Sequence, residues 1–277
     1  MEDKEYSYKE FKSYSDLLSQ EKDLKSKLYS DYKNKIDTQR EFAEFAIDFI
    51  KNNEEKMLTD STPFRDLANF FTVKAIKTFR AIQYLIENGF GEDAAVLIRC
   101  QFELLTNFLY ISKEDQNARA EKYIRYEYLL KEKFLKKLFH SNLFYEVYEK
   151  LPEERKKEIR ENCEKYEKLY PCKRFWSGKT VEQMADDVGL KDYYISVYCL
   201  FSNLVHSNVK SSEYYVVGDD NVIRFIIAIT DHLIGEVIEA NGNFILRILK
   251  QLNEIFQLGQ EDVIQEAQNR FCEAFSN

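Results

Sequence analysis

Apolar residues recur at helical spacing along most of the chain, separated by charged and polar residues. In the first 36 residues they form a narrow stripe of Tyr8, Phe11, Tyr14, Leu18, Leu28, Tyr32 and Ile36. The next stretch repeats the pattern with Phe42, Phe45, Ala46, Phe49 and Ile50. Such a stripe is typical of an amphipathic helix that lays one face on a core. The pattern predicts one long helix, or two, over residues 1–36, and a further helix around 42–50.

Short capping signals divide the following residues into further helices. Thr62 can cap a helix whose first residue is Pro63, because proline lacks the N–H that the first turn leaves unbonded. We expect that helix to end at Asn88-Gly89, since these residue types favour the left-handed conformation of a helix stop. Thr180 and the glutamine three residues later match a capping box, which predicts a short helix that Gly189 ends.

The segment from Ala94 to Ile111 is apolar on nearly all sides, which is typical of a buried helix. It nevertheless carries Arg99 and Glu103, which are four residues apart and therefore lie on one face. Burying either charge without a partner would cost several kcal/mol. We therefore expect the two side chains to be largely buried, paired, and in contact with polar groups from another helix.

A second polar stripe can supply those contacts. Four residues follow one another at four-residue steps on a helix predicted over about 192–206: Tyr194, Tyr198, Ser202 and His206. Asn203 lies beside them, and we expect Ser202 or His206 to lie near Arg99. Two interpretations stay open. The stripes form either a structural network between helices, or a pocket where Arg99 binds an anion and His206 titrates near neutral pH.

The remaining segments also fit helices, with one exception. A charged helix is predicted from Asn117 to His140, with a buried side of Tyr123, Tyr126, Leu130, Phe134 and Leu138. A strongly charged helix from Glu153 to Lys168 is predicted to be exposed. Residues 213–223, around Gly218, form the one plausible strand pair, a small hairpin. The C-terminal third is predicted to be helical, with Gly242 and Gly259 as weak points.

The composition favours an all-α fold. Glycine and proline together number only 11 of the 277 residues, where an average chain of this length carries roughly 30. A sheet-rich fold needs more tight turns than these residues can make, and 44% hydrophobic residues is too many for a disordered chain. We expect a single helical, bundle-like domain over residues 61–277, an N-terminal helical arm over residues 1–60, and at most one short hairpin.

Charge and cysteine usage narrow the class of protein. The net charge of −8 weighs against a nonspecific nucleic-acid binder, which normally has a strongly basic face. The charged N-terminus lacks the apolar core of a signal peptide, and no apolar run approaches the roughly 20 residues of a membrane span. Five scattered cysteines without a CxxC pair are typical of reduced thiols. These features predict a cytoplasmic protein that does not bind membranes.

No motif predicts a metal site or a cofactor. The three histidines, His140, His206 and His232, are far apart and form no HxxxH pair. The run Ser177-Gly178-Lys179-Thr180 is similar to the end of a phosphate-binding loop, but Lys173 stands where that loop needs a glycine. We interpret the run as a loop that leads into a capped helix, and we expect neither a metal nor a cofactor.

The polar stripes belong to a set of motifs that resembles a known family. The set is Gly91-x2-Ala94-Ala95-x-Leu97-x-Arg99-x3-Glu103, then Trp176-Ser177-Gly178-Lys179, Met184-Ala185 and Tyr194-x3-Tyr198-x3-Ser202-x3-His206-Ser207. Over roughly residues 70–215 it resembles an uncharacterised prokaryotic family, domain of unknown function 5677. That family is helical and has no assigned reaction, so the resemblance implies a fold and no activity. We take Asn203, Tyr194, Trp176 and Lys179 as candidate ligand contacts.

A more distant analogy leads to the HEPN class of helical nucleases, which is common in prokaryotic toxin and antiphage systems. Those nucleases place an arginine and a histidine on one helix as R-x(4–6)-H and use no metal. Here Cys199, Leu200 and Phe201 stand at the spacings before His206 where the arginine would lie. Arg99 would therefore have to act from another helix.

The analogy defines the first functional hypothesis, a metal-independent ribonuclease or phosphodiesterase of the defence or toxin type. Arg99 would stabilise phosphate charge and His206 would act as general acid or base. Glu103 and Tyr198 would orient them, and Ser202 completes the candidate catalytic set. The expected ligand is then RNA or a nucleotide.

The alternative hypothesis is a non-catalytic module whose polar cluster binds a small ligand or only fixes helix packing. The residues leave open whether the protein is an enzyme. Under either hypothesis the stripe of Tyr8, Phe11, Tyr14 and Leu18 is too narrow and too aromatic to stay in water on a free arm. We expect a homo-oligomer that forms through the N-terminal helices.

Overall fold

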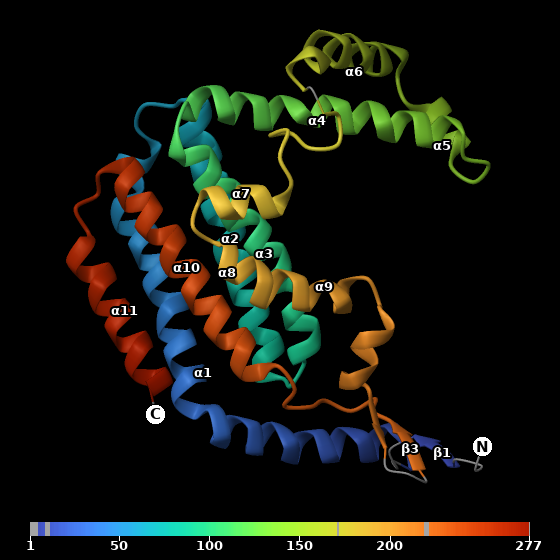
Figure 1. The fold of residues 1–277 in the computed structure, drawn as a ribbon, viewed down its shortest axis with the longest axis vertical. Helices are drawn as coiled ribbons and strands as arrows, with labels where there is room; N and C mark the ends of the chain where they lie inside the picture. The colour runs from blue at the N-terminus through green and yellow to red at the C-terminus, as the bar shows by residue number, and fades with distance from the viewer. Residues whose placement is uncertain (1–4, 9–11, 171, 219–221, 277) are drawn as a thin grey trace.

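A computed structural model of the protein describes residues 5–8, 12–170, 172–218 and 222–276 (Figure 1). The long helices are α1 (Tyr14–Leu58), α2 (Pro63–Glu87), α3 (Gly91–Lys113), α4 (Gln116–Phe139), α6 (Glu153–Tyr166), α10 (Ile234–Phe256) and α11 (Glu261–Ser276). Shorter helical segments are α5 (Tyr145–Lys150), η1 (Glu167–Leu169), α7 (Val181–Asp187), α8 (Lys191–Tyr193), η2 (Tyr194–Cys199), α9 (Leu200–Val205) and η3 (Val209–Tyr214). Within these described ranges the strands are β1 (Glu5–Tyr8), β2 (Val216–Gly218) and β3 (Val222–Phe225). The prediction of an all-α fold with one short hairpin is confirmed.

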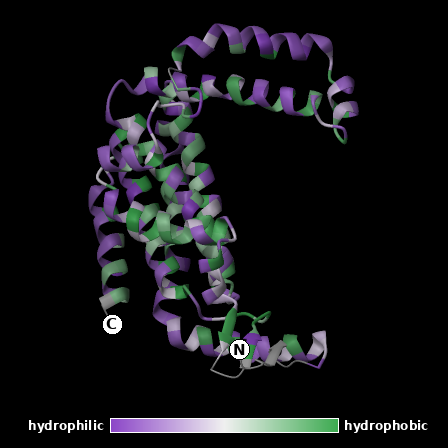
Figure 2. Cartoon of the chain, turned by 45° about the vertical axis from the view of Figure 1, so that its right-hand side comes forward, coloured by the Kyte–Doolittle hydropathy of each residue, from purple (hydrophilic) through white to green (hydrophobic). Residues whose placement is uncertain are grey.

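Helix α3 lies at the centre of the core and packs against α2, α10, α9 and α7. Its apolar side chains, such as Ile98, Phe102 and Leu105, are fully buried, as the all-round apolar pattern predicted. By length and composition α3 is also apolar enough to cross a membrane, contrary to the expectation that no segment is, but most of it is covered by neighbouring helices. Figure 2 shows the hydrophobic residues gathered along these inner helices.

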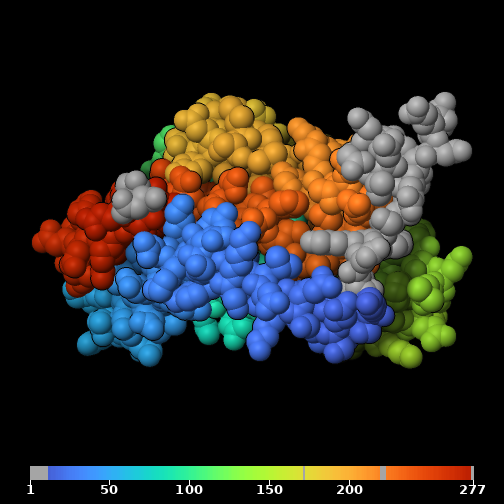
Figure 3. Space-filling model, turned by 90° about the horizontal axis from the view of Figure 1, so that it is seen from below, coloured from blue at the N-terminus to red at the C-terminus, as the bar shows by residue number. Residues whose placement is uncertain are grey.

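Helix α1 is one long helix that bends at Tyr32, where the backbone leaves helical geometry. After the bend, side chains such as Phe42 and Phe49 enter the core, and the helix packs against α2, α10 and α11. Figure 3 shows α1, in blue, along one face of the molecule next to the red of α11. The expected N-terminal arm of residues 1–60 is therefore shorter, because the second half of α1 belongs to the core.

A small sheet lies beside the first half of α1. Strand β2 pairs antiparallel with β3, which is the predicted hairpin around Gly218. Strand β1 pairs in parallel with β3 along Glu5–Tyr8, so these N-terminal residues form a strand and not the start of the predicted helix. A single sequence does not reveal such a pairing, because its two strands lie more than 200 residues apart.

Helices α4, α5 and α6 project from the other end of the bundle, where α4 and α6 pack side by side (Figure 1). Two residues assigned to the buried side of α4 are exposed, since Leu130 keeps 51% and Phe134 60% of its accessible surface. Conversely, Lys156 and Ile159 of α6 are buried, although the sequence predicted an exposed helix. The Lys156 ammonium pairs with Glu153 and lies 4.3 Å from the centre of the Tyr148 ring of α5. The pairing of α4 with α6 thus covers part of α6 and leaves part of the apolar side of α4 exposed.

Two glycines allow close packing that a larger residue would block. A Cβ atom on Gly91 would lie 2.0 Å from the carbonyl oxygen of His232, so the start of α3 can pass that backbone only as glycine. A Cβ atom on Gly242 would lie 2.2 Å from the ring of Phe271. Gly242 is thus the point where α11 approaches α10, and not the weak point that the sequence indicated.

Candidate functional site

The two polar stripes meet between α3 and the η2–α9 segment, as predicted. Arg99 donates from Nε to the Ser202 hydroxyl at 3.0 Å and from Nη2 to the Tyr198 hydroxyl at 2.8 Å. Its Nη1 lies 3.1 Å from Oε1 of Glu103, the same oxygen that accepts the Tyr198 hydroxyl proton at 3.0 Å. We call Arg99, Glu103, Tyr198 and Ser202 the polar cluster. The Arg99 side chain is 15% exposed and that of Glu103 37%, so the arginine is largely buried and the glutamate only partly.

Aromatic rings enclose the charged part of the polar cluster. The Arg99 guanidinium carbon lies 4.4 Å from the centre of the Tyr198 ring, within range of a cation–π contact. Tyr194 stacks on Tyr198 with ring centres 5.1 Å apart, and Phe102 lies 5.6 Å from Tyr198 on the core side. Burial, and next the Glu103 carboxylate, raise the pKa of Tyr198 to about 12. Tyr198 is therefore a neutral phenol at physiological pH, able both to accept from Arg99 and to donate to Glu103.

The local backbone explains which members of the second stripe reach Arg99. Residues Tyr194–Cys199 form a π-helical segment, and α-helical geometry resumes at Leu200. π-Helical turns are rare and concentrate at functional sites. The Ser202 hydroxyl also donates to the carbonyl oxygen of Tyr198 at 2.6 Å, which fixes the hydroxyl toward Arg99. Both hydroxyl partners of Arg99 thus come from the short stretch in which the π-helical segment passes into α9.

His206 does not join the polar cluster. It caps the C-terminus of α9, where its backbone N–H donates to the carbonyl oxygen of Ser202 at 3.1 Å. Its side chain is exposed and makes no hydrogen bond or ion pair with the residues that the structure describes. The physical reason is rotational drift: each four-residue step overshoots a full α-helical turn by roughly 40°, so two steps from Tyr198 carry His206 off the face. The expectation that Ser202 or His206 lies near Arg99 is met by Ser202.

Asn107 extends the polar stripe of α3 by one more turn and connects it to Trp176. Its amide nitrogen donates to the backbone carbonyl oxygen of Glu103 at 2.7 Å, and its amide oxygen accepts the Trp176 indole N–H at 2.7 Å. Trp176, from the loop before α7, is 8% exposed and packs edge-on against Tyr110 and Tyr123. The loop motif of the family resemblance is thereby held against α3.

Beyond Asn107 and Trp176 the surface opens into a groove of about 640 Å³. Helices α2, α3 and α4 and the Trp176 loop line it, with side chains from Asp66, Leu67, Phe70, Asn107, Tyr123, Ile124, Tyr126, Glu127, Leu130 and Trp176. We call this space the aromatic groove. Its volume lies within the range of small-molecule sites, and apolar walls with a few polar groups are typical of them.

The other candidate ligand contacts lie elsewhere. Lys179 pairs with Asp187 of α7 and lies over the ring of Tyr110, at 5.5 Å from its centre. Asn203 donates back to the carbonyl oxygen of Leu200 in its own helix. Of the four candidates, only Trp176 lines the aromatic groove, while Tyr194 covers Tyr198 in the polar cluster. Among the described residues, no three His, Cys, Asp or Glu side chains are grouped so that they could hold a metal ion.

The fold and the polar cluster together define an all-helical domain in which a central, buried helix presents an arginine–glutamate pair to an irregular helix. The chain belongs to the family of unknown function DUF5677, whose sequence model matches residues 65–223. That range contains the whole polar cluster and every residue that lines the aromatic groove. No curated protein and no solved structure matches the chain. The predicted resemblance over residues 70–215 is thus confirmed, and it carries no reaction with it.

Sequence reasoning missed the aromatic groove, although it named several of the residues there. Tyr123, Tyr126 and Leu130 were assigned to the buried side of α4, because their spacing of three and four residues is that of a core face. The available signal was the length of this apolar face, which continues through Phe134 to Leu138 on an otherwise charged helix. Leu130 and Phe134 stay exposed, whereas Leu138 at the end of the face is buried.

Proposed function

We propose that the protein is a non-catalytic ligand-binding module, in which the polar cluster braces one wall of the aromatic groove. The observation that carries this proposal is the continuous path from Arg99 and Glu103 through Asn107 to Trp176 in the groove wall. Each link is a hydrogen bond or ion pair between side chains or with the α3 backbone. The groove is the open end of this path, while the arginine at the other end is enclosed by protein groups.

The partners of Arg99 support binding over phosphodiester chemistry. All three guanidinium nitrogens already face protein groups, and one of these groups is a carboxylate at 3.1 Å. A phosphate would have to displace Glu103 and two hydroxyl groups to reach the charge. His206, the general acid or base of the ribonuclease hypothesis, is exposed at the end of α9 and is not part of the cluster.

The proposal is tested by binding of the neutral fluorescent probe N-phenyl-1-naphthylamine. Trp176 is the single tryptophan of the chain, so energy transfer from tryptophan to the probe reports on the aromatic groove. We expect saturable binding at one site, weakened at least tenfold by Phe70→Ala, which removes an exposed ring from the groove. Tyr84→Ala, which removes a 73% exposed ring from the same helix outside the groove, is the matched control. Absence of binding, or equal weakening by both variants, would contradict the proposal.

The ribonuclease hypothesis has its own test in the same preparations. His206→Ala is expected to leave the fold intact, because the side chain is exposed and makes no hydrogen bond or ion pair with the described residues. We expect wild type and His206→Ala to leave RNA uncut to the same degree, with or without EDTA. RNA cleavage by the wild type that the substitution abolishes would overturn the non-catalytic proposal.

We also propose that the protein self-associates through its N-terminal region. Tyr14 keeps 73% and Leu18 46% of its accessible surface, so this part of the stripe is not covered by its own chain. The predicted partners Tyr8 and Phe11 lie outside the described side chains. A Leu18→Glu substitution is expected to lower the mass measured by light scattering at micromolar concentration, whereas Leu58→Glu, exposed at the far end of the same helix, leaves it unchanged. A wild-type monomer would overturn this proposal.

A further inference from the structure

We propose that the ligand of the aromatic groove is a small molecule with an ammonium group on an apolar body. This inference rests on the proposed function, because it names the chemical class that the same site takes. Two properties of the groove carry it: the rings that form its walls, and the sign of the charges at its rim.

The rings are held in place by contacts with one another and with neighbouring polar groups. Tyr123 and Trp176 meet at 85° with ring centres 5.1 Å apart, and the Trp176 N–H is fixed by Asn107. Tyr126 donates its hydroxyl proton to the backbone carbonyl oxygen of Lys173 at 3.0 Å. With Phe70, which is 53% exposed, four aromatic side chains surround the space. The electron-rich faces of Trp, Tyr and Phe attract cations, and several rings around one space are the usual receptor of ammonium ligands.

The charged residues of the groove also favour a cationic ligand. Asp66 from α2 and Glu127 from α4 line the groove, and the lining contains no lysine, arginine or histidine. Asp66 uses Oδ2 to accept the Ser61 hydroxyl at 2.7 Å, and Glu127 uses Oε2 to pair with Lys131 at 2.7 Å. The described residues provide no partner for the second oxygen of either carboxylate. Two acidic residues in the lining of one largely apolar groove favour a cation and disfavour an anion.

The groove should therefore bind three ligands that share one apolar body with different affinities. Contact of the apolar body with the groove walls contributes to the affinity whatever the charge of the end group. A positive end group gains further from the rings and from the two carboxylates. A negative end group loses by repulsion from the same carboxylates, so the expected order of affinity is cation, neutral molecule, anion.

The test compares 4-phenylbutylamine, 4-phenylbutan-1-ol and 4-phenylbutanoate, which at neutral pH differ in end-group charge on one body. Each displaces N-phenyl-1-naphthylamine from the full-length protein, with Trp176 as the energy donor. We expect the amine to bind about tenfold more tightly than the alcohol, the size of one good cation–π or ion contact. We expect the butanoate to bind more weakly than both.

Substitutions at the rim separate charge from shape. Asp66→Asn together with Glu127→Gln keeps the side-chain outlines and removes both charges, so the amine is expected to lose its advantage while the alcohol binds as before. Glu121→Gln, on the same helix as Glu127 but paired with Arg125 outside the groove, is the matched control and should change nothing. Melting temperatures of all variants verify that they are folded.

The outcomes distinguish the proposed ligand class from the proposed function of the groove. If the alcohol binds as tightly as the amine, or the rim variant keeps the preference for the amine, the ammonium class is wrong and the binding groove stands. If none of the three compounds displaces the probe although the probe binds, the ammonium class is again wrong. If the probe itself does not bind, the proposed function fails, and the ligand class fails with it.

Discussion

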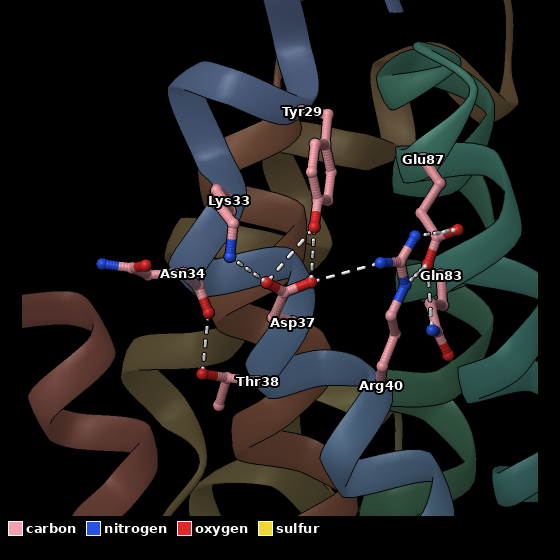
Figure 4. A network of polar contacts seen from close by, with 8 residues as sticks. All are labelled: Tyr29, Lys33, Asn34, Asp37, Thr38, Arg40, Gln83 and Glu87. Atoms are coloured by element: carbon pink, nitrogen blue, oxygen red, sulfur yellow. Dashed lines mark hydrogen bonds and ion pairs between the residues drawn. The ribbon is translucent and has the colours of Figure 1, made fainter. Parts of the chain in front are cut away.

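Two arginine networks among the described residues join helices through similar groups in different surroundings. Arg40 of α1 reaches α2, where Nε and Nη2 donate to the two carboxylate oxygens of Glu87 at 3.0 Å each (Figure 4). Its Nη1 also donates to Asp37, which accepts from Lys33 and Tyr29. The Arg40 side chain is 45% exposed, whereas that of Arg99 in the polar cluster is 15% exposed.

The difference shows that the pair with the better hydrogen-bond geometry need not contribute more to the free energy of unfolding. The Arg40–Glu87 pair has the better geometry, since it is bidentate. In water, however, such a pair gains little, because solvent competes for both charges and salt screens them. Arg99 makes single contacts to three groups, two of them neutral. Because its side chain is largely buried, water cannot easily replace a lost partner. Removing a partner from such a site leaves an uncompensated polar group.

The largest expected effect is that of removing Arg99. Arg99→Ala removes a largely buried cation, its cation–π contact with Tyr198, and its hydrogen bonds to the hydroxyl groups of Tyr198 and Ser202. We expect the free energy of unfolding to fall by about 2–3 kcal/mol, less than the 3–5 kcal/mol of a fully buried pair, because Glu103 can still reach water. Urea denaturation measures it. A smaller loss than that caused by Arg40→Ala would show that burial does not determine how much each network contributes to the free energy of unfolding.

An intermediate effect is expected for Tyr198→Phe, and it depends on pH. The substitution removes two hydrogen bonds, at an expected cost of about 1–2 kcal/mol at neutral pH. The pKa of Tyr198, about 12 in the folded protein, lies above the ordinary value of 10.0, chiefly through burial and next through Glu103. The folded state therefore holds this proton more tightly than the unfolded state, so its contribution is complete below pH 10 and is lost as the pH rises toward 12.

Urea denaturation of wild type and Tyr198→Phe between pH 8 and 12 tests this dependence. The phenylalanine variant lacks the titrating group, so the difference in stability between the two proteins should shrink as the pH rises. Other tyrosines with raised pKa values, such as Tyr170, are present in both proteins and cancel in the comparison. A difference that stays constant over this range would mean that Tyr198 titrates alike in the folded and unfolded states.

The smallest expected effect is that of Arg40→Ala. We expect a loss of at most about 1 kcal/mol in dilute buffer, because the pairs are exposed, and a smaller loss in concentrated salt. Salt should leave the effect of Arg99→Ala nearly unchanged, since a buried group is screened little. Both effects are measured by urea denaturation at low and high ionic strength. Equal salt dependence of the two variants would show that the Arg40 network and the polar cluster do not differ in their exposure to solvent.

Acid provides an independent check on the surface network. The hydrogen bond from Lys33, and further contacts with Tyr29 and Arg40, hold the pKa of Asp37 below its ordinary value of 3.8. The folded state therefore binds this proton less tightly than the unfolded state, and the contribution is present above that value and lost as the pH falls below it. Asp37→Asn should make the stability of the protein depend less on pH in this acid range.

Local chemistry made much of the site predictable. An arginine and a glutamate four residues apart on an apolar helix required partners, and the stripe with Tyr198 and Ser202 was the nearest polar set that could supply them. The same reasoning left open whether Ser202 or His206 lies near Arg99, and in the structure Ser202 makes the contact. The π-helical turn at Tyr194–Cys199 and the end of α9 after Val205 set where the stripe ends.

The sequence by itself determined the helices, their caps and the need to pair Arg99, because each follows from side chains close together in the chain. Periodicity, proline and glycine positions and capping residues act over a few residues, and their energies differ little between folds. Tertiary structure alone decided which faces remained open. The aromatic groove and the parallel pairing of β1 with β3 both depend on segments far apart in sequence. A pattern of apolar residues states how much surface a helix can bury, but only the packed neighbours set how much is covered.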